Sequence, residues 1–222
     1  MLRTMVFSDH LNFDIGIQYY YKNQGLVPPA LDYDVLFENL TNLVRRAEFH
    51  KAFLFYPKPD QFLMQEHFEQ NKYNWINGMK NSPYLDVIES SYIARPTIDH
   101  VPMDIRNKDS YYKVEKGTDI NLALHAVTKA TFNSYDLAIF LSADTDYIPL
   151  YDTLRTMGKM VVVIVIEGQH SMKIKPHVDE VIYIGKTFFS KSLRPERTKN
   201  KGGKVILNIG MNGVGKSGST DR

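Results

Sequence analysis

Short runs of β-branched, aliphatic and aromatic residues recur along the chain, and polar residues bound each of them. The longest run extends from Met160 to Ile166. It is far shorter than the roughly 20 residues that a membrane-spanning helix needs, but it suits a strand covered on both faces of a sheet. Shorter runs of the same character are Thr4 to Phe7, Ala52 to Tyr56, Leu85 to Ile93, Leu137 to Leu141 and Val181 to Ile184. The pattern predicts a set of buried strands.

Stretches with the spacing of amphipathic helices separate these runs. They extend from Tyr33 to His50, from Asp119 to Ala130 and from Asp146 to Met157, and the last is followed by Gly158, a residue suited to a left-handed helix end. Strands that alternate with helices need crossover connections, which join parallel strands. We therefore predict an α/β fold, a three-layer α/β/α sandwich with a mostly parallel central sheet.

Two segments do not follow this alternation. Residues 57–112 contain a polar aromatic stretch and a loop-like run, so we expect an insertion or an elaborated edge there, within a domain that spans residues 1–185. From residue 186 the composition becomes basic and Gly-containing. We expect residues 186–222 to form a basic C-terminal tail.

The charge of the chain is unevenly distributed. Lys and Arg total 27 against 25 Asp and Glu, a net charge of +2, which alone argues against a wholly basic nucleic-acid coat protein. Residues 186–222, however, contain nine Lys and Arg and two Asp and Glu, so residues 1–185 are net acidic. The near-neutral sum is a cancellation and does not argue against a nucleic-acid partner.

The chain has no cysteine, which excludes a disulfide scaffold and any metal site built on thiolates. Its first residues contain Asp9 and His10 before any long apolar region can form, so we expect no signal peptide. These features predict a cytoplasmic protein with no membrane partner, and they leave a homo-oligomeric state open.

Carboxylates follow the predicted strands. Asp144 and Asp146 come directly after one buried strand, Asp9 follows another, and Asp119 lies at the start of a predicted helix. Residues beyond the carboxyl ends of parallel strands border the crevice where α/β folds bind ligands. Like charges about 4 Å apart repel by roughly 4 kcal/mol, so such a cluster needs a cation. Oxygen ligands favour Mg²⁺ or Mn²⁺, which can activate water for phosphodiester hydrolysis.

Each of these residues also has an ordinary structural interpretation. An aspartate at a helix N-terminus is often only a cap, worth about 1 kcal/mol, and Asp119 or Asp146 could be one. Asn12 could be a turn residue, and the Ser142 hydroxyl could bond the local backbone.

Three stretches of the chain, in this order, resemble the motifs of the NYN domain family, which belongs to the PIN-like nuclease superfamily. They are Val6 to Asn12, Lys116 to Ala123, and Ser142 to Leu150, the last followed by Gly158 and Lys159. The resemblance covers roughly residues 3 to 185. It implies a PIN-like parallel α/β/α sandwich whose acidic pocket binds Mg²⁺ or Mn²⁺ and hydrolyses RNA.

The resemblance also implies roles for individual residues. The residues that match the family's metal-binding, catalytic acids are Asp9, Asp119, Asp144 and Asp146. Asn12 and Ser142 match residues that orient the cluster, and Lys116, which begins the second motif, is a further supporting candidate. His125 stands where the family often has an acid; it could weaken metal binding, contact a phosphate or pack against the sheet.

Two features near the C-terminus could contact nucleic acid. Basic side chains that neutralise phosphates release counterions, and the candidates here are Lys186, Lys191, Arg194, Arg197, Lys199 and Lys201. Residues 210–217 match the phosphate-loop pattern G-x-x-x-x-G-K-[ST]. Because too little chain follows for the helix that holds the phosphates, we interpret this match as part of a Gly- and Lys-containing tail.

The sequence thus predicts a metal-dependent ribonuclease that acts on single-stranded or unpaired RNA. Seven aromatic residues could stack unpaired bases, although aromatic residues in core positions are commoner. They are Tyr19, Tyr20, Tyr21, Tyr73, Trp75, Tyr111 and Tyr112. A non-catalytic RNA-binding or regulatory module is the first alternative. The second takes Asp144-Thr145-Asp146 as the D-x-D motif of a nucleotide-sugar glycosyltransferase.

Overall fold

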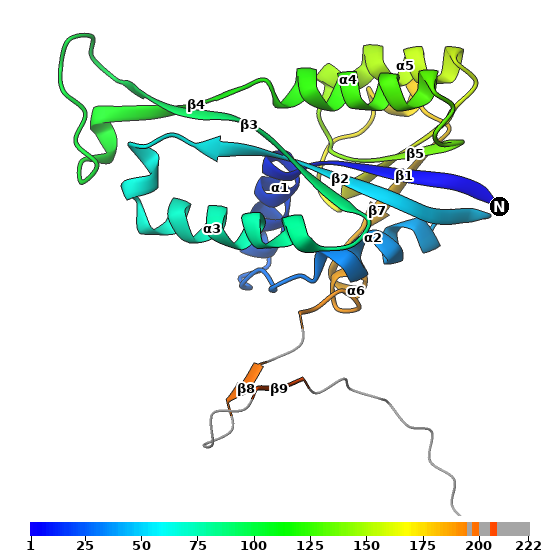
Figure 1. The fold of residues 1–222 in the computed structure, drawn as a ribbon, viewed down its shortest axis with the longest axis horizontal. Coiled ribbons are helices and arrows are strands. Elements are labelled where there is room, and N and C mark those ends of the chain that lie inside the picture. Colours follow the sequence, from blue (N-terminus) through cyan, green and yellow to red (C-terminus); the bar gives the residue numbers. More distant parts are fainter. Residues whose placement is uncertain (195–196, 200–204, 208–222) are drawn as a thin grey trace, which may run out of the picture.

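A single mixed sheet forms the centre of the computed structural model, which describes residues 1–194, 197–199 and 205–207. In these residues the sheet has seven strands in the order β4-β3-β2-β1-β5-β6-β7, all parallel to their neighbours except β4, which is antiparallel to β3 (Figure 1). The strands are β1 Leu2–Asp9, β2 Ala47–Pro59, β3 Leu85–Pro96, β4 Tyr111–Lys116, β5 Leu137–Leu141, β6 Met160–Ile166 and β7 Glu180–Ile184. A separate antiparallel pair joins β8 Arg197–Lys199 to β9 Val205–Leu207.

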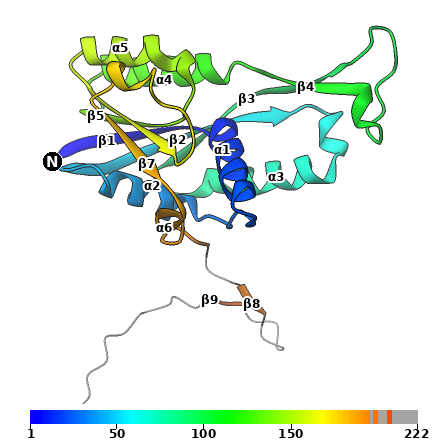
Figure 2. The same cartoon turned by 180° about the vertical axis from the view of Figure 1, so that it is seen from behind.

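Helices cover both faces of the sheet (Figures 1 and 2). One face carries α1 His10–Asn23, α2 Tyr33–Asn42, α3 His67–Gly78 and α6 Lys186–Phe189, and the other carries α4 Thr118–Thr131 and α5 Ile148–Thr156. Short 3-10 turns are η1 Leu63–Gln65, η2 Met79–Asn81, η3 Lys108–Ser110, η4 Thr145–Tyr147 and η5 Lys175–His177. The predicted three-layer α/β/α sandwich is therefore confirmed. No helix in the described part of the chain is long and apolar enough to cross a membrane.

The alternation of side chains along the strands divides the core into two layers. In β1, Val6 packs with α1 and α2, whereas its neighbour Phe7 packs with α4 and α5, as the two-residue period of a strand requires. Both layers are apolar, so the central strands β5 and β6 are buried on both sides. Each large apolar side chain buried in this way stabilises the fold by about 1.5–3 kcal/mol.

Some elements differ from the sequence prediction. The helix that begins at Tyr33 ends at Asn42 rather than at His50, because the chain turns through Arg46, which has a left-handed φ of 66°, and enters β2. α1 was not predicted as a helix. Its buried residues alternate with the exposed Ile15 and Tyr19, which blur the amphipathic pattern.

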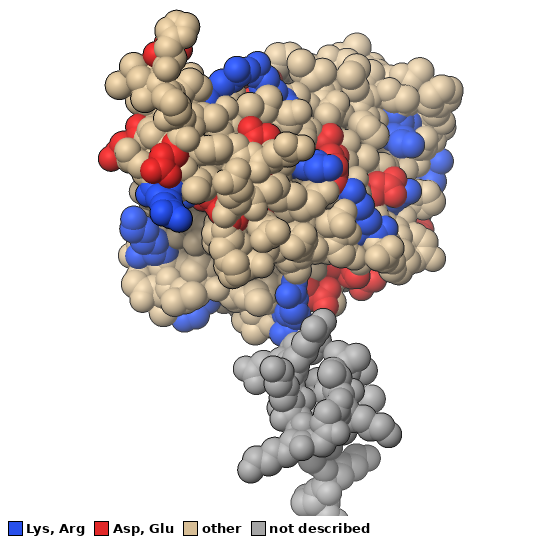
Figure 3. All heavy atoms as spheres, turned by 60° about the vertical axis from the view of Figure 1, so that its left-hand side comes forward, with Lys and Arg blue, Asp and Glu red and all other residues tan. Residues whose placement is uncertain are grey.

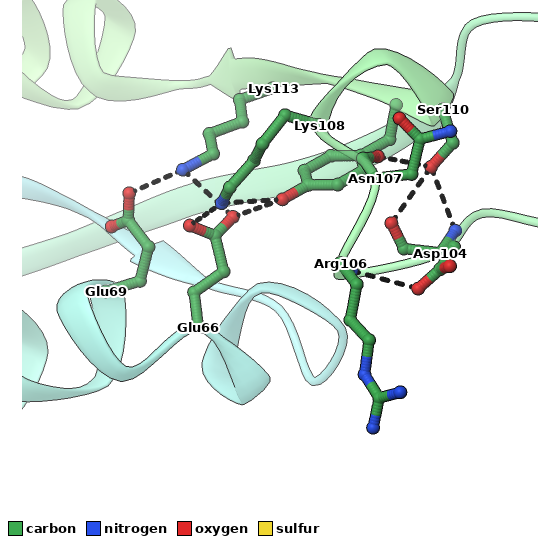
Figure 4. A network of polar contacts seen from close by, with 9 residues as sticks. Glu66, Glu69, Asp104, Arg106, Asn107, Lys108, Ser110 and Lys113 are labelled. Carbon is green, nitrogen blue, oxygen red and sulfur yellow. Dashed lines mark hydrogen bonds and ion pairs between the residues drawn. The ribbon is translucent and has the colours of Figure 1, made fainter.

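The segment 57–112 continues the strand–helix alternation through α3 and then forms the β3–β4 edge of the sheet. Here Glu66 accepts hydrogen bonds or ion pairs from the Tyr111 hydroxyl (2.6 Å), from Lys108 and from Lys113 (3.2 Å), and Lys113 also contacts Glu69 at 2.7 Å (Figure 4). This network fastens β4 to the start of α3, so the edge has a fixed position relative to the rest of the sheet.

The packed part of the chain extends past residue 185, the boundary expected from composition. Phe189 in α6 is fully buried against Phe13 and Tyr21 of α1. Leu193 forms an isolated bridge with Leu31, and the Arg194 guanidinium lies 5.1 Å from the centre of the Trp75 ring. Residues 186–194 therefore belong to the packed domain.

Candidate acidic site at the switch point of the sheet

The strand order reverses between β1 and β5. After β1 the chain builds the sheet outward through β2, β3 and β4, and then returns to place β5 on the other side of β1. Neighbouring crossovers leave in opposite directions at such a switch point, which opens a crevice beyond the carboxyl ends of the two strands. Asp9 is the last residue of β1, and Ser142, Ala143 and Asp144 follow β5.

Asp9 is a buried carboxylate with two fixed partners. It caps α1, since its Oδ1 accepts a hydrogen bond from the Asn12 backbone N–H at 3.0 Å, and its Oδ2 lies 3.1 Å from the Tyr147 hydroxyl. Only 4% of its surface is exposed. Burial, reinforced by the negative charges of Glu115 and Asp119, raises the pKa of Asp9 from its ordinary value to about 6.

The Tyr147 hydroxyl lies between two carboxylates. It is 2.7 Å from Asp119 Oδ1 as well as 3.1 Å from Asp9 Oδ2. Because a tyrosine hydroxyl carries one proton, it donates to only one carboxylate at a time. Burial and the adjacent charges raise the pKa of Tyr147, so this group remains protonated. When both aspartates are ionised, one of them therefore lacks a hydrogen bond from this hydroxyl.

Glu115 adds a further carboxylate that was not predicted from the sequence. Burial and the charges of Asp119 and Asp144 raise its pKa. Glu115 lies near the end of β4, which runs antiparallel to β3. Neither this strand nor its direction was predicted, so Glu115 could not be placed at the carboxyl edge. Tyr147 was likewise missed as a site residue, and its only signal was its position directly after Asp146.

Local hydrogen bonds shape the loop after β5. Ser142 Oγ accepts from the Asp144 backbone N–H at 3.2 Å, and Asp144 Oδ1 accepts from the Asp146 N–H at 2.9 Å, which caps η4. The side-chain carbonyl of Asn12 accepts from the Ala143 N–H at 3.1 Å. Asn12 thus links the start of α1 to this loop across the switch point.

The other site candidates from the sequence are Asp146, Lys116 and His125. Asp146 and Lys116 are exposed. His125 points to the sheet, where its ring packs against Phe53 (5.9 Å) and Phe55 (5.5 Å). Burial, with a smaller effect of Lys129, lowers the pKa of His125.

The donor chemistry of the site suits a hard divalent cation, but its geometry is not that of a preformed metal centre. The carboxylates are oxygen ligands with an excess of negative charge, as Mg²⁺ and Mn²⁺ require. Among the residues that the structure describes, however, no group of three or more His, Asp or Glu side chains is arranged to hold a metal ion. The hydroxyl of Tyr147 lies between Asp9 and Asp119 instead.

Three of the basic residues that the sequence suggested make contacts outside this cluster. The Lys186 N–H donates to the Tyr20 hydroxyl, the Lys191 carbonyl accepts from Asn39, and Arg194 covers Trp75. Only backbone is described for Arg197 and Lys199 in β8, and Lys201 and residues 210–217 lie outside the described residues. On the face shown in Figure 3, basic and acidic side chains are interspersed, so this face has no continuous basic surface.

Comparison with known proteins identifies the family. The model of the NYN domain matches residues 3–185. The chain belongs to the NYN domain family. This family has a PIN-like, nuclease-type fold, in agreement with the sheet described above.

One solved structure has a fold similar to that of this NYN domain. The chain is similar to the crystal structure of a protein of unknown function, VPA0982, from Vibrio parahaemolyticus RIMD 2210633, with a TM-score of 0.51 and 15% sequence identity over 85% of this chain and 95% of that one. At this identity the likeness concerns the fold alone. No curated protein matches this chain.

Proposed function

We propose that this NYN domain is a metal-dependent ribonuclease that hydrolyses phosphodiester bonds in single-stranded or unpaired RNA. Family membership supports a nuclease-type protein, and the position of the acidic cluster at the switch point supports the location of its active site.

The observation that carries the proposal is the shared hydroxyl between Asp9 and Asp119. Two carboxylates contact one proton donor, while Glu115 and Asp144 add negative charge nearby. Clusters of this kind are costly unless a cation compensates them. A fold that needed only helix caps would not require the carboxylates of β1, α4 and the β5 loop to meet at one edge.

Asp9, Asp119, Asp144 and Asp146 are the residues that would hold Mg²⁺ or Mn²⁺ in this proposal. Such an ion lowers the pKa of bound water and polarises the phosphodiester. Asn12 and Ser142 fix the loop that carries Asp144, because their side chains accept from the Ala143 and Asp144 N–H groups. Asp146 is exposed in η4, the short turn that Asp144 caps.

The test is cleavage of labelled single-stranded RNA by the purified protein with Mg²⁺ or Mn²⁺. We expect cleavage by the wild type, none in EDTA, and a large loss in the double variant Asp144→Asn, Asp146→Asn. An exposed acid on α2, Glu38, supplies the matched control Glu38→Gln, which we expect to cleave normally. A double variant as active as the wild type would overturn the proposal.

A second candidate function is a non-catalytic RNA-binding module. The observation that favours it is the absence, in the described residues, of three carboxylates arranged around one metal position. It predicts RNA binding without turnover in the same experiment. The D-x-D glycosyltransferase interpretation has no comparable support, because Asp144 caps its own turn and, together with Asp9 of another strand, lies close enough to Tyr151 to raise its pKa.

A further inference from the structure

An open groove adjoins the acidic site. It has a volume of about 580 Å³, and its walls come from α1, the loop after β5 and the loop after β6. The residues that line it are Asn12, Tyr19, Ala143, Asp144, Thr145, Gly168, Gln169 and His170. Asn12 and Asp144 belong both to the site and to this groove, so a polymer held at the acidic cluster would continue into it.

Tyr19 forms the far end of one wall. It is the first of three consecutive tyrosines in α1. The other two have structural roles: Tyr21 is buried in the core, and the Tyr20 hydroxyl donates a hydrogen bond to Glu167 at 3.0 Å. Tyr19 is 59% exposed. Asn12 and Tyr19 are seven positions apart, so they share one side of α1 and lie on the order of 10 Å apart along its axis.

The opposite wall is held firmly against α1. Gly168 turns the chain with a left-handed φ of 91°, and Gln169 Oε1 accepts a hydrogen bond from the Ile166 N–H at 3.0 Å. A Cβ on Gly16 would lie 2.7 Å from Gln169 Nε2, so the loop approaches α1 as closely as a glycine allows. The exposed His170 follows this fixed turn.

The chemistry of the groove suits a base rather than a phosphate. Its walls offer aromatic rings, the side-chain amides of Asn12 and Gln169, and backbone groups. Its one carboxylate, Asp144, would repel a phosphate. A cationic group lies beyond Tyr19, where Lys22 lines an adjoining apolar hollow with Ile15 and Val27. Single-strand binding proteins combine aromatic platforms for bases with basic groups along the backbone in this way.

We propose that the groove is a nucleobase subsite in which Tyr19 stacks on the base next to the scissile phosphate, with His170 on the facing wall. This inference rests on the proposed function, because it takes the acidic cluster as the place where the phosphodiester lies. It gives the preference for unpaired RNA a physical basis, since a base in a duplex has no free face for Tyr19.

The test measures binding separately from cleavage. Fluorescence anisotropy with a labelled single-stranded RNA in EDTA gives the affinity of the full-length wild type, Tyr19→Ala, Tyr19→Phe and Tyr19→Trp. Stacking on one aromatic ring corresponds to roughly a 5- to 150-fold change in affinity. We expect Tyr19→Ala to weaken binding by a factor in this range, and the aromatic variants to bind within about twofold of the wild type. Phe132→Ala, at an exposed aromatic residue that follows α4, is the matched control.

A second arm uses a set of single-stranded RNAs, each of which lacks the base at a different position. If Tyr19 stacks on a particular base, the RNA that lacks this base binds equally well to the wild type and to Tyr19→Ala, because in that RNA the substitution removes no stacking contact. Equal binding of intact RNA by wild type and Tyr19→Ala would overturn the subsite, as would the same loss in Phe132→Ala. Binding without cleavage would refute the ribonuclease but retain the subsite, and a wild type that binds no RNA would refute both.

Discussion

Asn12 Oδ1 accepts a hydrogen bond from the backbone N–H of Ala143 at a distance of 3.1 Å, across 131 positions of the sequence. The bond joins the first turn of α1 to the loop that carries Asp144. It therefore ties the two sides of the switch point together and fixes the positions of their carboxylates relative to each other.

Replacing Asn12 by Ala leaves the Ala143 N–H without its acceptor. An unpaired, partly buried backbone donor costs about 1–3 kcal/mol, so we expect the free energy of unfolding in urea to fall by this amount. Asn23→Ala, at the exposed end of the same helix, is the control. A stability equal to that of the control would show that the bond does not fasten the loop.

Divalent cations should stabilise the folded protein. A ligand that binds only the folded state raises stability by RT ln(1 + [L]/Kd), about 2.7 kcal/mol at 100 times Kd. We expect Mn²⁺ to raise the melting temperature of the wild type and to have a much smaller effect on Asp119→Asn. In the wild type, Asp119 is exposed and its carboxylate contacts the Tyr147 hydroxyl. Glu38→Gln should respond like the wild type; an equal response of Asp119→Asn would place the cation elsewhere.

His10 makes the fold sensitive to acid. Burial, with a smaller effect of Lys72, lowers the pKa of His10 from 6.5 to about 3. Between these values the unfolded chain binds a proton that the folded chain does not, so the stability from neutral His10 is complete above pH 6.5 and falls as the pH is lowered toward 3. The loss approaches about 1.4 kcal/mol per pH unit.

Comparison with His10→Gln isolates this contribution. Asp9, whose pKa is raised to about 6, has the opposite effect over part of the range, and it remains in both proteins. We expect urea unfolding between pH 7 and 4 to show a smaller loss of stability in His10→Gln than in the wild type. Parallel pH profiles would refute the assignment to His10.

Two glycine-to-alanine variants should change stability in opposite directions. In a helix the substitution is favourable by up to about 1 kcal/mol, and at Gly78, where a Cβ meets nothing within 4 Å, we expect that gain. At Gly16 a Cβ would lie 2.7 Å from Gln169 Nε2 and 2.9 Å from Ile166 Cδ1. Overpacking of this kind costs about 1–3 kcal/mol. Thermal unfolding distinguishes the two, and a stabilised Gly16→Ala would show that the β6 loop yields easily.

The sequence predicted the elements whose burial is uniform. β5 and β6 begin and end at the predicted residues, because strands covered on both faces are continuous apolar runs between polar ends. The position of Asp9 at the end of β1 followed from the same reasoning. α1 was not predicted, since the exposed Ile15 and Tyr19 interrupt its polar side.

The arrangement of the residues within the site was harder to predict from the sequence. Tyr147 meets Asp9 and Asp119 only because η4 brings its ring under α4 and beside β1, three elements that are distant in sequence. Glu115 joins the cluster because β4 runs antiparallel, and a single strand shows no direction in its hydrophobic pattern. Both residues depend on tertiary packing, which periodicity does not report.

The most direct test of the central claim is the rate of cleavage of single-stranded RNA as a function of Mn²⁺ concentration, for the wild type, Asp119→Asn and Glu38→Gln. We predict saturable, Mn²⁺-dependent cleavage by the wild type and Glu38→Gln. For Asp119→Asn we predict a loss of more than about tenfold, since even outer-shell changes at metal sites cost 10- to 100-fold. Cleavage that is independent of Mn²⁺ and Mg²⁺, or undiminished in Asp119→Asn, would contradict the account.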